Sequence, residues 1–380
     1  MGLAIIVSLV MPVFLGVSVA QAVTTDAITN TPDQTAWFNG VVRVVVYDGG
    51  TIYVGGDFTA AVQNGNTITR NHVAAIDAAT GSVLPWNPNT NGNVLAITYT
   101  PSGVYLGGVF GTVGGARHTR IARVSLASGA VDSTFQHSAN RAVRALTSDG
   151  STVYAGGNFT SIDGASRAQL AAFNDASGSL SSTWLPVANG IVRALDASNG
   201  VVYVGGEFST MDGLSRGRYL AAVNPTTGAL QPGFNSPLGY RVMAVAATTS
   251  QIYAAADGPG GNLLATSLDG TLQWLLTTDG GFQAVTVLGD TVYAGGHFGN
   301  ACTTSRTGLH GTCLDGKVSR KKLLAVSSSG QLLPWAPQAN SSLGAHSLSA
   351  NPQTGQIAAG GEWTTLNSGK IYQPYFALFG

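Results

Sequence analysis

The chain has 380 residues, equal numbers of acidic and basic side chains, and only 9% charged residues. A net charge of zero argues against a nucleic-acid partner, which needs a concentrated basic surface, although it does not exclude a local basic patch. No nucleic-acid partner is therefore expected. The 51 glycines, with many threonine, serine and asparagine residues, are typical of a β-rich protein with tight turns and not of a helical one.

The first residues predict an export signal. Residues 5–19 are almost wholly apolar and precede Ala20-Gln21-Ala22, a small-x-small cleavage pattern. We therefore expect a signal peptide over 1–22, a linker over 23–33 and one secreted, extracellular domain over 34–380. The alternative is an uncleaved membrane anchor, but the apolar run is short for a span. No later stretch is long and apolar enough to cross a bilayer, so no membrane span is expected after signal removal.

One recurring stretch organises the rest of the chain. This stretch is Tyr53-Val54-Gly55-Gly56-Asp57-Phe58, and it recurs in five further copies. A degenerate copy without glycine occurs at 253–257. The copies recur with a spacing near 50 residues. A fixed period of this length indicates a single supersecondary unit repeated along the chain.

Each copy predicts four antiparallel strands. In the first unit, Gly49-Gly50 and Thr80-Gly81 each join two apolar runs, as in hairpins where glycine accepts a positive φ. Four such strands per unit, arranged radially, predict an all-β, seven-bladed β-propeller. The last unit lacks its fourth strand, and 35–40 matches the fourth-strand sequence of other units. The N-terminal strand is therefore expected to close the last blade and leave no free edge.

Two units depart from the common spacing. The loop between the second and third strands is shortened to 257–261 in the fifth unit and enlarged to 299–322 in the sixth. In an exported chain, Cys302 and Cys313 of the enlarged loop predict a disulfide. Insertions often lie on the binding face of a repeat array; the alternative is a surface loop pinned by its disulfide. No metal site is expected, because two cysteines and one histidine at this spacing match no zinc pattern. The candidate ligand-binding residues of the enlarged loop are Arg306, Lys317 and Arg320.

The units have the form Val-Tyr-Val-Gly-Gly-(Asp/Glu/Asn)-Phe, followed by Leu-Ala-Ala, Thr-Gly and Trp. This pattern resembles the secreted actinobacterial β-propellers built from delta-60 repeats, which are grouped near the quinoprotein-dehydrogenase-like propellers. The resemblance covers 34–380 and implies a propeller fold, mostly without an assigned activity. True quinoprotein dehydrogenases are similar in fold but use adjacent cysteines beside the quinone. Cys302 and Cys313 are not adjacent, so no quinone and no other cofactor is expected.

The start of each first strand supplies the main candidate site. Because the first strand of a propeller blade is the innermost, these residues are expected to surround the mouth of the central channel. Three arginines, a histidine and a glutamine there are suited to holding a carboxylate, phosphate or sulfate. The alternative is salt bridging between blades. The seven aligned positions are Arg43, Leu95, Arg144, Arg193, Met243, Gln283 and His346.

Other polar positions have structural interpretations. Asp57, Glu207 and Glu362 follow the Gly-Gly pair, where a ring of polar groups suits a metal or acid–base chemistry. The favoured interpretation is pairing with the arginine before the third strand, at Arg70, Arg167, Arg216 and Arg320.

Two further motifs are also assigned structural roles. The stretch 213–217 matches the G-x-S-x-G hydrolase pattern, but no helix follows it. The once-per-unit aromatics are expected to pack between blades and not to bind sugar. They are Trp37, Trp86, Trp184, Phe234, Trp274 and Trp335.

The sequence thus predicts a secreted, monomeric, non-catalytic binding propeller at the cell envelope. It would recognise an anionic or glycan ligand, or a protein partner, on the face that bears the long loops. The alternative is an extracellular enzyme at the channel mouth, either a polysaccharide lyase or hydrolase or a quinone-dependent oxidoreductase; a third possibility is a purely structural envelope protein. No catalytic residue is assigned, because no nucleophile, base and orienting group occur in a recognisable combination.

Overall fold

The computed structural model describes residues 28–380, and its strands pair in antiparallel sheets. The predicted signal peptide and the first half of the predicted linker lie outside the described residues. The helices of 28–380 are three-residue 3-10 turns, so none of them can span a membrane. These turns are η1 (Ser215–Gly217), η2 (Leu309–Gly311) and η3 (Asn367–Gly369).

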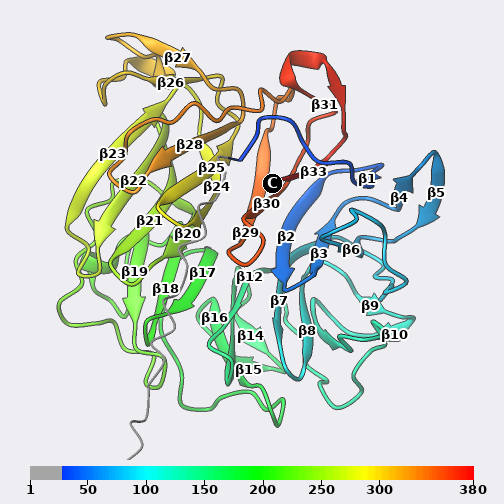
Figure 1. Cartoon of the computed structure of the whole chain (residues 1–380). Coiled ribbons are helices and arrows are strands. Elements are labelled where there is room, and N and C mark those ends of the chain that lie inside the picture. The colour runs from blue at the N-terminus through cyan, green and yellow to red at the C-terminus, as the bar shows by residue number, and fades with distance from the viewer. Residues whose placement is uncertain (1–27) are drawn as a thin grey trace, which may run out of the picture.

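Seven sheets contain the same meander, in which the second strand pairs with the first and the third, and Figure 1 shows them arranged around a common centre. The first strands are β2 (Val42–Asp48), β7 (Val94–Thr100), β12 (Val143–Ser148), β17 (Val192–Ser198), β20 (Val242–Ala247), β24 (Phe282–Leu288) and β29 (Ala345–Asn351). The second strands are β3 (Thr51–Gly56), β8 (Gly103–Gly108), β13 (Thr152–Gly157), β18 (Val201–Gly206), β21 (Gln251–Gly258), β25 (Thr291–Gly296) and β30 (Gln356–Gly361). The third strands are β6 (Val73–Asp77), β11 (Ile121–Val124), β16 (Leu170–Asn174), β19 (Leu220–Val223), β22 (Gly260–Ser267), β28 (Leu323–Ser327) and β33 (Phe376–Phe379).

The first strands contact one another in chain order around the centre, and β29 also contacts β2. The Gly-Gly pair makes this packing possible. A Cβ on Gly55 would lie 2.8 Å from Cγ1 of Val94 in the next unit, and a Cβ on Gly56 would overlap the carbonyl oxygen of Val41. The first glycine therefore lets neighbouring sheets pack face to face, while the second lets the second strand cross close to the start of the first.

The outer, fourth strand is much shorter than the sequence suggests. A full strand, β23 (Leu272–Thr278), occurs in the fifth unit and pairs with β22. In five other units a single bridge joins the third strand to the outer segment, as between Ile76 and Val83. An arginine before the third strand holds this segment: Arg70 Nη2 donates to the Leu84 carbonyl over 2.7 Å.

In the first, third and fifth units a tryptophan links the unit to the next one, whereas the second and fourth units have phenylalanine at this place. The Trp86 indole N–H donates to the Ser125 carbonyl over 2.8 Å, and the indole of Trp184 donates to Asn224 in the same way. The packing interpretation therefore fits these residues. Trp37 differs, because its ring packs edge-on against Tyr372 at 5.7 Å.

Most loops between second and third strands are short hairpins that project from one face. Strands in this class are β4 (Ala60–Gln63), β5 (Asn66–Thr69), β9 (Thr112–Val113), β10 (Ala116–Arg117), β14 (Ser161–Ile162), β15 (Ala165–Ser166), β26 (Asn300–Cys302), β27 (Lys317–Ser319), β31 (Thr365–Leu366) and β32 (Ile371–Tyr372). A side-chain oxygen fastens each loop at its base: Asn39 Oδ1 accepts 2.9 Å hydrogen bonds from the backbone N–H groups of Thr59 and Ala60. The same clasp recurs in five further units, with Asp279 in place of asparagine in one of them.

The enlarged loop of the sixth unit docks onto the fifth sheet. Its β26 pairs with β23 through Ala301 and Thr278, and its predicted disulfide between Cys302 and Cys313 is confirmed. Its short helix η2 lies against β22. There Gly311 adopts a φ of +81°, and a Cβ on it would overlap the backbone of Gly260, so glycine is required for this contact.

The N-terminal pairing differs from the prediction. Within 35–40, the short strand β1 (Trp37–Phe38) pairs with β4 of the first unit and not with the last sheet. The preceding residues lie beside β33, because the Asp33 N–H donates to the Leu378 carbonyl over 2.7 Å. The prediction assigned the contact with the last sheet to residues 35–40, because it aligned Trp37 with the buried tryptophans of the other units. The residue that bonds to β33 is Asp33, which comes earlier in the chain.

Candidate functional site

A β-bulge at the start of each first strand sets the geometry of the candidate site. In every one of the seven sheets the register between first and second strands shifts at a single residue, as at Arg43 between Val42 and Val44. The same shift occurs at each of the other aligned positions. A bulge re-aims the extra side chain away from the regular pleat, and bulges are common beside functional sites. Here they place seven side chains together: Arg43, Leu95, Arg144, Arg193, Met243, Gln283 and His346.

These seven residues surround the mouth of a central cavity, as predicted. The outer part measures about 460 Å³ and also has Asp57, Asn93 and Val109 in its wall. The inner part measures about 210 Å³ and is lined mainly by alanine and branched aliphatic side chains further along the first strands. Since the polar groups lie at the mouth and the deeper wall is apolar, a charged ligand group would be held at the mouth.

Two of the three arginines at the mouth are paired with carboxylates of their own units. Arg43 Nη2 lies 2.6 Å from Asp57 Oδ2, and Arg193 pairs with Glu207. The prediction that these acids pair with the arginines before the third strands is therefore wrong. Those arginines instead donate to backbone carbonyls of the outer segments. Their side chains lie beside the outer segment, whereas Asp57 and Glu207 lie beside the first strand. The mouth is consequently less basic than the arginines alone suggest.

Arg144 is different from the other two arginines. The residue after the Gly-Gly pair of its unit is Asn158 and not an acid. Within 28–380, the buried Arg144 Nε and the buried Asn158 Oδ1 each have no hydrogen-bond partner. Burial and the charge of neighbouring Arg193 lower the pKa of Arg144, although Glu207 acts in the opposite direction. The site thus holds a cation whose solvation has been partly removed without replacement by a carboxylate.

His346 and Gln283 add polar groups to the same ring. The His346 Nε2 lies 3.4 Å from Arg43 Nη1, and since arginine can only donate, this nitrogen is an acceptor. Burial, and then the charge of Arg43, lower the pKa of His346 to about 4. The Gln283 Oε1 is buried without a partner among the described residues. At neutral pH the described residues at the mouth therefore present the unpaired guanidinium of Arg144 beside the neutral polar groups of His346 and Gln283.

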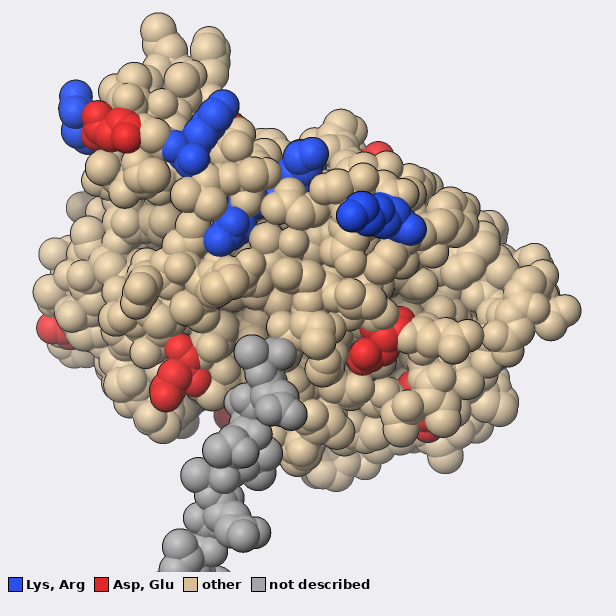
Figure 2. Space-filling view, turned by 45° about the horizontal axis from the view of Figure 1, so that its top comes forward, with Lys and Arg blue, Asp and Glu red and all other residues tan. Residues whose placement is uncertain are grey.

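The candidate residues of the enlarged loop are not brought to the mouth, since none of them lines its cavity. Arg306 pairs with Asp315 at 2.9 Å, and Arg320 donates to the Leu333 carbonyl. Lys317 is exposed on β27. On the face shown in Figure 2, lysine and arginine side chains gather in the upper part, whereas most acidic side chains lie lower.

The bulges are the feature that sequence reasoning missed, although it aligned the residues correctly. A signal was present: a β-branched or other apolar residue precedes each candidate, and the partner strand ends in two small residues. The described residues contain no cluster of three His, Cys, Asp or Glu side chains suited to a metal ion. The arrangement at the mouth is one of fixed donors and acceptors around a concave opening, which suits binding of a small polar group.

Comparisons with known proteins identify the fold. A family described as a β-propeller domain of unknown function, DUF5122, matches residues 101–135. Among curated proteins, none matches the sequence. The solved structure of U3-55K is similar with a TM-score of 0.59 and 14% identity over 92% of this chain and 99% of that chain.

Two further structures are similar to this chain. The WD40 β-propeller domain of Doa1 has a TM-score of 0.52 and 10% identity, over 92% of this chain and 96% of that chain. The computationally designed Ika8 protein has a TM-score of 0.53 and 12% identity, over 90% of this chain and 98% of that chain. At such low identity these likenesses concern the fold alone. The chain is an all-β protein of the β-propeller class.

Proposed function

We propose that this protein is a seven-bladed, exported, monomeric propeller that acts as a non-catalytic binding module at the cell envelope. Its channel mouth holds an anionic group of an envelope glycan. The seven meander sheets and the contact of β29 with β2 support the blade number. The contacts of Thr29 and Asn30 with the sixth unit, and of Asp33 with β33, support closure of the ring by the N-terminal segment.

The observation that carries the function is the unpaired guanidinium of Arg144. An arginine that is partly buried beside Arg193 and lacks a carboxylate gains free energy when an anion enters. The outer cavity of about 460 Å³ gives room for one carboxylate, phosphate or sulfate group and the sugar that carries it. The unpaired Gln283 Oε1 would accept a hydroxyl of the same ligand.

The test is a binding screen with Arg144→Gln. Hexagalacturonate, a heparin-derived hexasaccharide, inorganic phosphate and inorganic sulfate serve as probes, and affinities are measured by titration calorimetry. One charge-assisted contact contributes about 1.5–3 kcal/mol, so Arg144→Gln should weaken binding of an anionic probe by roughly 10- to 150-fold. Arg306→Gln is the matched control, because it removes the same charge from the enlarged loop.

The two variants separate the alternatives. Equal binding by wild type and Arg144→Gln, or loss of binding in Arg306→Gln instead, would show that the mouth is not the anion site. Turnover of a polysaccharide probe would favour the extracellular enzyme, for which the described residues offer no assembled nucleophile and base.

A further inference from the structure

A second and larger cavity lies on the loop-bearing side of the fifth unit. It measures about 840 Å³, which is within the range of small-molecule sites. It exists because the turn between β21 and β22 is reduced to Gly258-Pro259-Gly260, where other units project a hairpin. The enlarged loop of the sixth unit covers one side, with His310 in the wall. We call this cavity the fifth-unit cleft.

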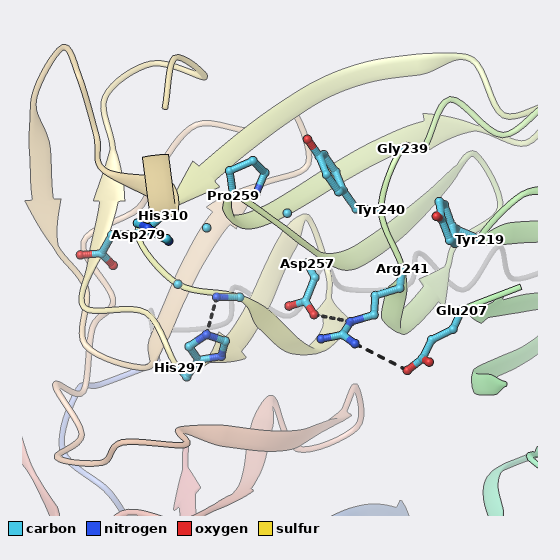
Figure 3. Close-up of a pocket in the computed structure, with 14 residues that line it drawn as sticks. Glu207, Tyr219, Gly239, Tyr240, Arg241, Asp257, Pro259, Asp279, His297 and His310 are labelled. Carbon is cyan, nitrogen blue, oxygen red and sulfur yellow. Dashed lines mark hydrogen bonds and ion pairs between the residues drawn. The ribbon is translucent and has the colours of Figure 1, made fainter. Parts of the chain in front are cut away.

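The centre of the fifth-unit cleft is an arginine held between two carboxylates. Arg241 Nε donates to Asp257 Oδ2 over 2.5 Å, and Arg241 Nη1 lies 3.8 Å from Glu207 Oε1. The hydrogen bond and charge of Asp257 raise the pKa of Arg241. Figure 3 shows Arg241 lying between the two acids, with the ring of Tyr240 beside the same opening. The two carboxylates therefore hold the Arg241 side chain in place without a ligand.

The charges of the lining argue against an anionic ligand. The lining contains three acidic side chains, Glu207, Asp257 and Asp279, and one arginine, Arg241. An ammonium ligand is also poorly matched, because Asp257 and Glu207 already pair with Arg241. Asp279 accepts 2.8 Å hydrogen bonds from the backbone N–H groups of Gly299 and Asn300. A ligand without net charge fits this lining best.

The remaining groups offer donors and acceptors side by side. His297 Nε2 accepts from the Gly281 N–H over 3.0 Å, so the neutral ring carries its proton on Nδ1 and can donate with it. The carboxylate lone pairs that Arg241 does not use can accept. Sugar hydroxyls both donate and accept, and so match such a mixture. The Tyr240 ring, with 44% of the residue exposed, supplies a flat apolar surface for the C–H face of a pyranose.

We propose that the fifth-unit cleft is a binding site for a neutral saccharide. It is separate from the anion site of the channel mouth in position and in ligand chemistry. The two sites lie on opposite sides of Glu207, which pairs with Arg193 at the mouth and with Arg241 in the cleft.

The experiment is titration calorimetry of the full chain with cellohexaose, maltohexaose, laminarihexaose, mannohexaose and chitohexaose, with hexagalacturonate as the charged comparison. At least one neutral probe should bind, and Tyr240→Ala should weaken that binding roughly tenfold or more, because the ring loses its stacking contact. Asp257→Asn should weaken it as well, since Arg241 is then no longer fixed. Tyr99→Ala is the matched control, because Tyr99 is 37% exposed and does not line the cleft.

A second measurement keeps the inference testable if a variant is unstable. Saturating neutral hexaose should slow hydrogen–deuterium exchange of wild-type residues 256–262 and leave 93–95 unchanged. The proposal is overturned if none of the neutral probes binds, if Tyr240→Ala binds like wild type, or if the protection falls elsewhere. Arg144→Gln should leave the neutral probe's affinity unchanged, so that failure of the mouth site and failure of the cleft remain distinguishable.

Discussion

Asp175 forms a buried hydrogen-bond group that joins the third unit to the second. Its carboxylate accepts from Thr100 Oγ1 at 2.5 Å, Ser102 Oγ at 2.7 Å and the Tyr105 hydroxyl at 2.8 Å. Only 5% of Asp175 is exposed, and Tyr105 is fully buried. Burial raises the pKa of Tyr105 to about 12, so its hydroxyl is a donor at all ordinary pH values. We expect this group to be an important contact between the two sheets.

The change Asp175→Ala would leave the two buried hydroxyls, of Thr100 and Tyr105, without this acceptor. Each unsatisfied hydroxyl costs about 1–3 kcal/mol, so the free energy of unfolding should fall by about 2–6 kcal/mol. Asp175→Asn keeps an oxygen acceptor and should lose less, about 1–2 kcal/mol. Asn174→Ala is the control, because this neighbouring side chain accepts hydrogen bonds from Ser177 in its own exposed turn and, within 28–380, bonds to no other unit.

The assay is equilibrium unfolding in urea, followed by tryptophan fluorescence and by far-ultraviolet circular dichroism. The loss of stability is the shift in midpoint multiplied by the denaturant slope. An Asp175→Ala midpoint within 0.2 M urea of wild type, roughly the uncertainty of such a measurement, would refute the assignment of this network to stability.

Two further predictions concern His346 and the N-terminal segment. Because the pKa of His346 falls from 6.5 to about 4 in the folded chain, the unfolded chain binds more protons between these values. Stability should therefore decrease as the pH falls through this window, by about 1.6 kcal/mol from pH 6.5 to pH 5. Urea midpoints of His346→Gln should lack this contribution. Phe38→Ala should lower the free energy of unfolding by about 3–5 kcal/mol, because the fully buried ring packs on Phe58 at 4.3 Å and Phe376 at 5.8 Å. Trp37→Ala is its control, and equal losses in the two variants would mean that the buried ring does not anchor the segment.

Much of the fold follows from the sequence because backbone proximity selects glycine. Gly55 and Gly56 are required where strands approach closely, so the repeated pair marks the second strand of most units and fixes the spacing between units. The positions at the channel mouth could be aligned for the same reason, since the candidate residue lies 12 residues before the first position of this pair in six units and 14 residues before it in the last. The disulfide of the enlarged loop followed from two cysteines in a chain predicted to be exported.

The wrong or missed sequence predictions concern contacts that depend on the three-dimensional arrangement of the strands and not on sequence spacing. Arg70 and Asp57 lie at the same end of the unit, where the Arg70 N–H donates to the Thr59 carbonyl. Their side chains nevertheless differ in partner, because Arg70 binds a carbonyl of the outer segment and Asp57 binds Arg43 of the first strand. The clasp formed by Asn39 was missed because an Asn-Gly pair also predicts an ordinary turn. The fifth-unit cleft was missed because a cavity left by a short loop depends on neighbours in other units.

The tryptophan links between units have a consequence for how the protein unfolds. In an open repeat array, terminal units can fray because each contacts only one neighbour. Here the indole of Trp335 donates to the Thr29 carbonyl, near the beginning of the described chain, over 3.0 Å. Loss of order in one unit removes a partner from the unit before it and from the unit after it. Because β29 also contacts β2, each of the seven first strands has two neighbours, and unfolding should involve all seven sheets as one cooperative event.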